Sequence, residues 1–172
     1  MTQKAVNNAK VLYRLNISRS DVEETHKIFT KAPFLLETLT NPVVSEEAKE
    51  VVFDKIARQS GMPELLENFM KMMCRIGEIG QITDIFNCYY EYWDKMNHIL
   101  HAKVIYADDK AKEEKEAIQK QLESIYPDEK VVLSEETDAS LLGGYVVRVG
   151  YEEDDHSYEG KLRRLERKLT GR

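Results

Sequence analysis

Two histidines near the middle of the chain, His98 and His101, are separated by two residues. On a helix this spacing places two imidazoles one turn apart, which is an arrangement that can hold a metal ion. No carboxylate stands in the position that the HExxH pattern of metalloproteases requires, and no third ligand is indicated. The pattern therefore favours surface or partly buried histidines, and no metal site is expected.

A second grouping, Asp154-Asp155-His156-Ser157, contains an acid, a base and a nucleophile in consecutive positions. Catalytic triads need side chains that converge from separate segments, so neighbours in sequence rarely form one. Asp155 or Ser157 is better explained as the cap of a final helix. The acidic run 152–155 also lacks the spacing and the glycine of a calcium-binding loop. A small hydrolase that uses His156 and Ser157 is thus the least favoured alternative.

The glycine pair Gly143-Gly144 and the two cysteines complete the set of residues that could do chemistry. A phosphate-binding loop leads into a helix, whereas a β-prone run, 145–149, follows these glycines. They are expected to serve a turn or a close approach of two backbones. Cys74 and Cys88 are too far apart for a CxxC motif and are expected to be reduced packing residues. The sequence predicts no enzyme active site and no cofactor.

The composition agrees with a folded, acidic protein. The chain has 172 residues with 42% hydrophobic side chains and a formal net charge of −6, which is enough apolar material for a core. Nucleic-acid binding is disfavoured because a phosphate backbone requires a basic surface. No apolar run is long enough to span a membrane, and no secretory signal is visible at the N-terminus.

Charge is distributed unevenly along the chain. Residues 1–104 carry a net charge of −1, residues 105–158 carry −9, and residues 159–172 carry +4. This change in composition predicts two domains, 1–104 and 105–172.

The first hundred residues show the apolar periodicity of successive helices. A helix is expected around residues 5–13, and Ser20 with Glu23 resembles a capping box that opens the next one. Further helices are predicted after Pro33, after Ser45, after Pro63 and from Ile82 to Leu100. Short connections between six helices indicate an all-α bundle.

The remaining residues combine both periodicities. Residues 102–106, 130–133 and 145–149 are β-prone, and an amphipathic helix ending near Ile125 lies between the first two. A terminal helix after Ser157 has cations opposite an apolar stripe formed by Leu162, Leu165 and Leu169. The expected fold class is therefore mainly α, with an N-terminal six-helix bundle followed by a small α/β C-terminal domain.

The order of several motifs resembles the delta subunit of F-type ATP synthase, the family of the mitochondrial oligomycin-sensitivity-conferral protein. Residues 39–49, LTNPVVSEEAK, are similar to the family's L-x-N-P-x-(V/I)-S-x-E-x-K region. Residues 138–150, DASLLGGYVVRVG, are similar to its D-x-S-L-(I/L)-G-G segment, in which Asp138, Gly143 and Gly144 are motif positions. Asp155 and Ser157 match a following D-x-S. The resemblance covers essentially the whole chain in the family's order.

The resemblance implies a non-catalytic stator subunit that joins the α3β3 catalytic head to the peripheral stalk, so that proton flux is coupled to ATP synthesis. In the family, the first and fifth helices receive the N-terminal helix of an α subunit. By position, that groove would involve Val6, Ala9, Tyr13, Phe69, Met72 and Met73. The stalk subunit b would meet the C-terminal domain at Leu162, Leu165 and Leu169.

The resemblance also implies a location on the cytoplasmic face of the bacterial cell membrane, as a peripheral part of the synthase. The alternative is a free-standing helical adaptor or regulatory protein of similar architecture that has no synthase partner.

Overall fold

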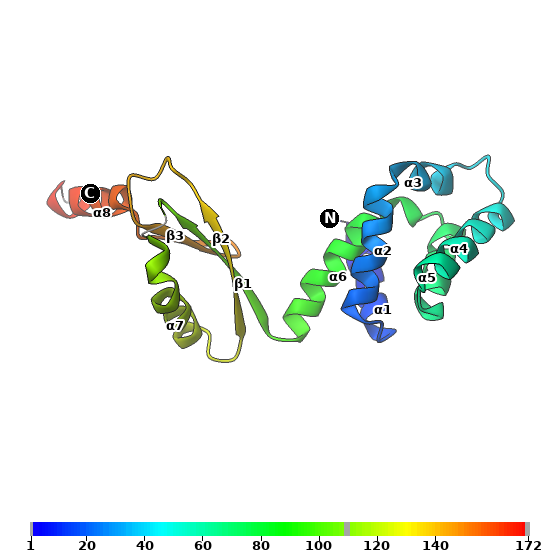
Figure 1. Cartoon of the computed structure of the whole chain (residues 1–172), viewed down its shortest axis with the longest axis horizontal. Helices are drawn as coiled ribbons and strands as arrows, with labels where there is room; N and C mark the ends of the chain where they lie inside the picture. Colours follow the sequence, from blue (N-terminus) through cyan, green and yellow to red (C-terminus); the bar gives the residue numbers. More distant parts are fainter. Residues whose placement is uncertain (1, 109–110, 171–172) are drawn as a thin grey trace. The chain divides into compact units, whose positions relative to one another are not determined.

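The computed structural model describes residues 2–108 and 111–170. The chain divides into two compact units, Met1–Asp94 and Lys95–Arg172 (Figure 1). The boundary expected from charge, between residues 104 and 105, falls inside the first strand of the second unit, β1 (Ile99–Tyr106).

The N-terminal unit is helical, as the apolar periodicity predicts. Its elements are α1 (Gln3–Arg14), α2 (Arg19–Lys31), α3 (Pro33–Thr40), α4 (Glu46–Ser60), α5 (Glu64–Arg75), a 3₁₀ turn η1 (Ile79–Gln81) and α6 (Ile82–Met96). The six α-helices in the described residues confirm the expected bundle. Their buried faces form one core, whose largest fully buried side chains include Leu12, Leu39, Phe53, Leu66, Met70, Met73, Phe86 and Tyr89.

Local sequence signals begin and end several of these helices. The hydroxyl of Ser45 accepts a hydrogen bond from the Ala48 amide at 3.3 Å, and Gly61 ends α4 in the left-handed region at φ 68°. The prediction that Ser20 caps α2 is wrong. Ser18 is the N-cap, and its hydroxyl accepts from the Asp21 amide at 3.2 Å. Both serines precede an acidic residue three positions on, so sequence spacing alone does not separate them.

The C-terminal unit contains a four-stranded mixed sheet. Its elements are β1, a 3₁₀ turn η2 (Ala111–Glu114), α7 (Lys115–Ile125), β2 (Lys130–Thr137), β3 (Tyr145–Val149), β4 (Glu152–Asp155) and α8 (Tyr158–Thr170). The strand order is β2-β1-β3-β4, in which only β1 and β2 are parallel. This agrees with the expected mainly helical fold and its small α/β part.

The end of α6 and the presence of β4 differ from what the sequence predicts. The sixth helix ends at Met96, and Leu100 lies in β1. His98 has a left-handed φ of 52°, which stops the helix before it reaches Leu100. The sequence does not predict β4, because four consecutive acidic residues have low strand propensity. It forms through pairing with β3, and its charges suit the exposed edge of a sheet.

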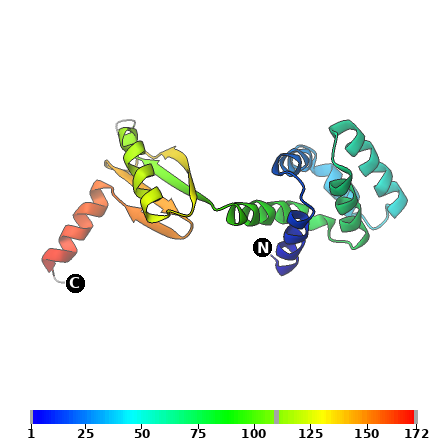
Figure 2. The ribbon, with the colours of Figure 1, turned by 90° about the horizontal axis from the view of Figure 1, so that it is seen from below.

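The register assigns side chains to the two faces of the sheet. Ala102, Val104 and Tyr106 of β1 are opposite Val149, Val147 and Tyr145 of β3, so these six side chains share one face. They form a core with Ile118 and Leu122 of α7, which lies along this face (Figure 2). The opposite face includes Lys103 and Arg148, which form ion pairs with Glu136 and Glu153.

Candidate interaction surfaces

The residues expected to form the groove between the first and fifth helices fall into two groups. Ala9, Phe69 and Met73 are buried in the bundle core. Val6 and Tyr13 are partly buried against that core, and Met72 is 40% exposed. A partner that meets this side of the bundle can therefore touch Met72 directly, whereas the three buried residues act by holding α1 and α5 in place.

Helix α5 has two apolar faces, and only one of them is buried. Leu66, Phe69, Met70 and Met73 face the core. Leu65 and Met72, with Ile76 at the C-cap of the helix, are spaced by seven and four residues, share another face and are 54%, 40% and 53% exposed. The sequence shows that α5 is apolar on both faces, but the bundle decides which face stays open. Leu65 and Ile76 are thus surface residues that the sequence analysis did not single out.

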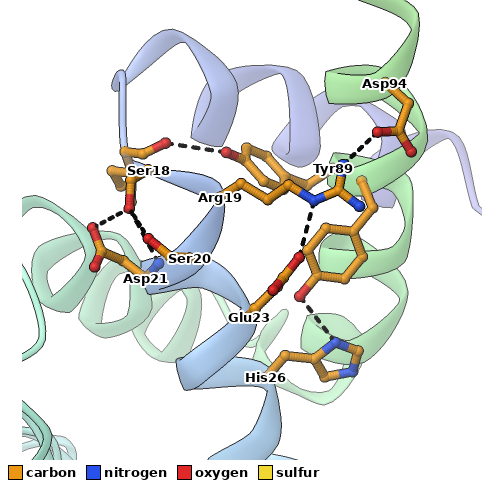
Figure 3. A network of polar contacts seen from close by, with 10 residues as sticks. Ser18, Arg19, Ser20, Asp21, Glu23, His26, Tyr89 and Asp94 are labelled. Atoms are coloured by element: carbon orange, nitrogen blue, oxygen red, sulfur yellow. Dashed lines mark hydrogen bonds and ion pairs between the residues drawn. The ribbon is translucent and has the colours of Figure 1, made fainter. Parts of the chain in front are cut away.

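A network centred on Arg19 joins α2 to α6 (Figure 3). The Arg19 guanidinium forms an ion pair with Glu23 at 2.9 Å and another with Asp94. It also lies over the rings of Tyr90 and Trp93, 5.6 and 4.8 Å from their centroids. Cation–π contacts of this kind add to the ion pairs. The i,i+4 spacing could have indicated the pair with Glu23, but no spacing rule could have indicated the contacts with α6, because its residues are distant in sequence.

Two further tyrosine contacts extend this network. Tyr90 is within hydrogen-bond distance of His26, with Oη and Nδ1 3.2 Å apart, and the Tyr89 hydroxyl donates to the Ile17 carbonyl at 3.1 Å. Burial raises the pKa of Tyr90 to about 12 and lowers the pKa of His26. Both shifts favour the neutral form of the group, and the arrangement is best explained as a structural connection between α2 and α6.

In the C-terminal unit, Gly143 and Gly144 support the start of α8. The Gly143 carbonyl accepts from the Tyr158 amide at 3.0 Å, and the Tyr145 carbonyl accepts from the His156 amide at 2.9 Å. A Cβ atom on Gly143 would lie 2.4 Å from the Tyr158 ring, and one on Gly144 would lie 2.5 Å from the His156 carbonyl oxygen. The expected close backbone approach is confirmed, and glycine is required for it.

Asp155 and Ser157 cap α8, as expected from their position before the helix. The Ser157 hydroxyl accepts from the Gly160 amide at 3.0 Å and donates to Asp155 Oδ1 at 2.5 Å. Asp155 Oδ1 also accepts from the Ser157 amide at 2.9 Å. These hydrogen bonds, chiefly the one from the Ser157 hydroxyl, lower the pKa of Asp155. The sequence Asp-His-Ser therefore forms a helix cap in this structure, which accounts for the residues that suggested a hydrolase.

Asp138 has a similar role at the end of β2. Its amide donates to the Tyr106 carbonyl at 2.8 Å, and its Oδ1 accepts from the Ser140 amide at 2.9 Å. Side-chain and backbone hydrogen bonds from Ser140 lower the pKa of Asp138. The motif residues Asp138, Gly143, Gly144, Asp155 and Ser157 therefore shape the β2–β3 connection and the start of α8.

Helix α8 leaves its apolar face uncovered by the described part of the chain. Leu162, Leu165 and Leu169 are 63%, 56% and 87% exposed, and Gly160 is the buried residue of the helix. The remaining helix positions include five cations, Lys161, Arg163, Arg164, Arg167 and Lys168. A leucine stripe bordered by positive charge is typical of a helix that docks against another helix.

The fold separates the two histidines whose spacing suggested a metal site. His98 lies beyond the end of α6, and His101 is in β1, so the two do not share a helix. Within residues 2–108 and 111–170, no cluster of three or more metal-ligating side chains occurs. Cys74 and Cys88 are free, and burial raises the pKa of Cys74 to about 11. None of the described helices is long and apolar enough to cross a membrane.

Comparisons with known proteins identify the family. The sequence profile of the family described as ATP synthase delta (OSCP) subunit matches residues 5–169. A protein named ATP synthase subunit delta from Prochlorococcus marinus (strain MIT 9301) is 30% identical over 146 residues, which cover 85% of this chain and 81% of that protein. The chloroplastic ATP synthase delta chain of Chlamydomonas reinhardtii is 24% identical over 157 residues, covering 91% and 72%.

The fold has a solved counterpart. A chain of the Toxoplasma gondii mitochondrial ATP synthase hexamer superposes with a TM-score of 0.63 at 15% sequence identity, covering 99% of this chain and 98% of that one. At this identity the comparison shows the shared fold.

A helical bundle followed by a small α/β unit, with exposed apolar side chains along helices of both, is the architecture of an interaction subunit. The family match specifies which one: the chain belongs to the ATP synthase delta (OSCP) subunit family. It is a non-catalytic stator subunit of the proton-transporting F-type ATP synthase and a peripheral member of that complex.

Proposed function

We propose that the N-terminal unit binds the α3β3 catalytic head and that the C-terminal unit binds subunit b of the peripheral stalk. Torque from the rotating central stalk acts on the head, and the head must be held still for proton flux to drive ATP formation. A stator protein with separate docking surfaces for head and stalk provides this restraint. The proposed location is the cytoplasmic face of a bacterial membrane.

The observation that carries the proposal is the uncovered leucine stripe of α8. Three large apolar side chains, each more than half exposed, repeat at helical spacing on a helix that buries little against its own unit. Burial of such side chains by a partner helix contributes about 25 cal/mol per Å² of apolar surface. The stripe therefore supports docking of a stalk helix at Leu162, Leu165 and Leu169.

The proposal for the head rests on α1 and α5. An amphipathic helix from the N-terminus of an α subunit would lie against Val6, Tyr13 and Met72, with Ala9, Phe69 and Met73 supporting the surface from the core. The exposed Leu65 and Ile76 extend the same α5 face. Methionine side chains are flexible and suit a surface that adapts to a partner.

A binding experiment with matched variants tests the head contact. A labelled peptide with the sequence of an α-subunit N-terminus is titrated into the wild-type chain and the Met72→Glu variant. We expect Met72→Glu to weaken binding by about tenfold or more, since a charge would be buried. Phe34→Glu is the matched control, because Phe34 is 69% exposed on α3, outside the proposed surface. Wild-type affinity for Met72→Glu would exclude this part of the proposal.

A pull-down experiment tests the stalk contact. The double variant Leu162→Asp/Leu165→Asp and the wild-type chain are compared for their capture of a soluble subunit b dimer. Loss of capture with unchanged circular dichroism is the expected result, because the leucines contribute little to the fold of the free chain. Val43→Asp, at an 88% exposed site in the N-terminal unit, is the control. Undiminished capture by the double variant would contradict docking on α8.

A further inference from the structure

The β4 side of one sheet face in the C-terminal unit is left without a helix by the described residues. α7 packs against β2, and Lys115 near its start forms an ion pair with Glu135 of that strand. Beside α7 lies a groove of about 460 Å³, bordered by α7 on one side and by β3 and β4 on the other. Its lining includes Leu122, Ile125, Tyr126, Tyr145, Val147 and Val149.

The dimensions of the groove suit a helix. Neighbouring strands are about 4.8 Å apart and packed helices are about 8–10 Å apart, so one helix covers roughly two strands. On this face of the four-stranded sheet, α7 buries Tyr145 and Val147 of β3 and leaves room for a second helix beside it, toward β4. Ile125 at the edge of α7 is 56% exposed and Val149 is partly exposed, so both can still contact an added helix.

The outer edge of the groove is acidic. Glu152 and Asp154 of β4 are opposite Val149 and Val147 of β3, so their side chains are on the groove face. Glu152 accepts a long hydrogen bond of 3.4 Å from Tyr126, and Asp154 is 2.7 Å from His156 Nε2. Glu153 also borders the groove but forms an ion pair with Arg148, whose register position is on the opposite face. The described residues that line the groove include no lysine or arginine.

We propose that this groove binds a basic amphipathic helix from another protein chain. The apolar side of that helix would pack on Ile125 and Val149, while its lysine or arginine side chains would lie along Glu152 and Asp154. This surface is distinct from α8, whose own flanks are basic and require an acidic partner. The C-terminal unit would thus recognise two helices of opposite charge, one on each surface.

The recognition chemistry can be tested without any other synthase subunit. The probe is a synthetic peptide with the sequence of residues 158–170, YEGKLRRLERKLT, which has the required leucine spacing and five cations. Its binding to the full chain is measured by fluorescence anisotropy at low and high salt. We expect saturable binding that weakens as salt rises, and no binding of a peptide in which the five cations are replaced by glutamate.

Matched charge reversals locate the site. Glu152→Lys/Asp154→Lys is expected to weaken peptide binding by about tenfold or more. Glu116→Lys/Glu123→Lys changes the charge equally at two exposed α7 positions that do not line the groove, and it should leave most of the affinity intact. Circular dichroism of all variants checks that the sheet remains folded. Equal losses in both double variants, or equal affinity for the acidic peptide, would overturn the proposal.

Light scattering of the wild-type chain tests whether a second copy of the same chain occupies the groove. A monomer is expected at chain concentrations below those that saturate the peptide. A dimer that dissociates on Glu152→Lys/Asp154→Lys would mean that α8 of a second copy fills the groove, and it would overturn the assignment to another protein. A failed peptide titration would leave the proposed contacts of α8 and α5 unaffected, because those are measured with separate variants.

Discussion

Gly144 and His156 approach each other so closely that a Cβ atom on the glycine would lie 2.5 Å from the histidine carbonyl oxygen. The glycine also has a φ of 81°, which L-residues with side chains rarely adopt. This contact holds the end of the β2–β3 connection against the residue that precedes the cap of α8. The direction in which α8 starts therefore depends on a backbone–backbone contact that only glycine permits.

The first prediction concerns this contact. Gly144→Ala should destabilise the C-terminal unit by about 2–4 kcal/mol, because it adds a steric clash to an unfavourable φ. Hydrogen exchange of β3 and α8 amides measures the loss. Gly150→Ala is the control: Gly150 has a φ of 58°, but a Cβ atom there would meet nothing within 4 Å, so the change should cost about 1–2 kcal/mol. Equal protection in the two variants would contradict the proposed role of the close approach.

The second prediction concerns the pH dependence of the α8 cap. The pKa of Asp155 is lowered in the folded state by its hydrogen bonds from Ser157. The ionised carboxylate therefore stabilises the fold above its unfolded pKa of about 3.9, and this contribution is lost as pH falls through the lower folded pKa. We expect the stability difference between wild type and Asp155→Asn to be constant above about pH 5 and to shrink toward pH 3.

Urea unfolding at a series of pH values, with amide exchange in α8 as the readout, measures this difference. Asp128→Asn, which replaces a carboxyl group in the exposed turn before β2, is the control. A stability difference for Asp155→Asn that does not change with pH would show that the carboxylate charge is unimportant for the cap.

The third prediction concerns the Arg19 network. Arg19→Met keeps much of the side-chain volume but removes two ion pairs and two ring contacts. We expect a loss of about 1–2 kcal/mol in the stability of the N-terminal unit. Trp93 is the single tryptophan of the chain, so its emission reports this site directly. Arg14→Met, at an exposed position in the last turn of α1, should change neither stability nor emission.

The fourth prediction concerns Cys74. Burial raises its thiol pKa to about 11, compared with roughly 8.5 for a free thiol, so the reactive thiolate is roughly a hundredfold or more scarcer at pH 8. Iodoacetamide should therefore modify Cys74 slowly in the native protein and quickly in urea. Mass spectrometry of alkylated peptides measures both rates. Rapid modification of native Cys74 at pH 8 would contradict its partial burial and its raised pKa.

Several features of this fold are local and could be predicted from the sequence. Helix periodicity identifies the six-helix bundle because each helix buries one face against the same core. Gly143-Gly144 followed by a strand predicts a close backbone approach, and Ser157 before an amphipathic run predicts a cap. Each of these inferences uses only residues within a few positions of one another.

Other features depend on contacts between distant segments. Glu152–Asp155 becomes a strand only because β3 provides hydrogen bonds, and the same pairing places Glu152 and Asp154 beside an apolar groove. Arg19 meets Asp94 across 75 positions in sequence.

The sequence by itself determined the type of most elements, the family of the protein and the motif residues, because these depend on local patterns and their order. Only the tertiary structure decided that Met73 is buried while Met72 is exposed, that the described residues leave the leucines of α8 uncovered, and that they leave the β4 side of one sheet face open. The physical reason is that a helix with two apolar faces can bury either one. Which face remains for a partner is decided by how the neighbouring elements pack.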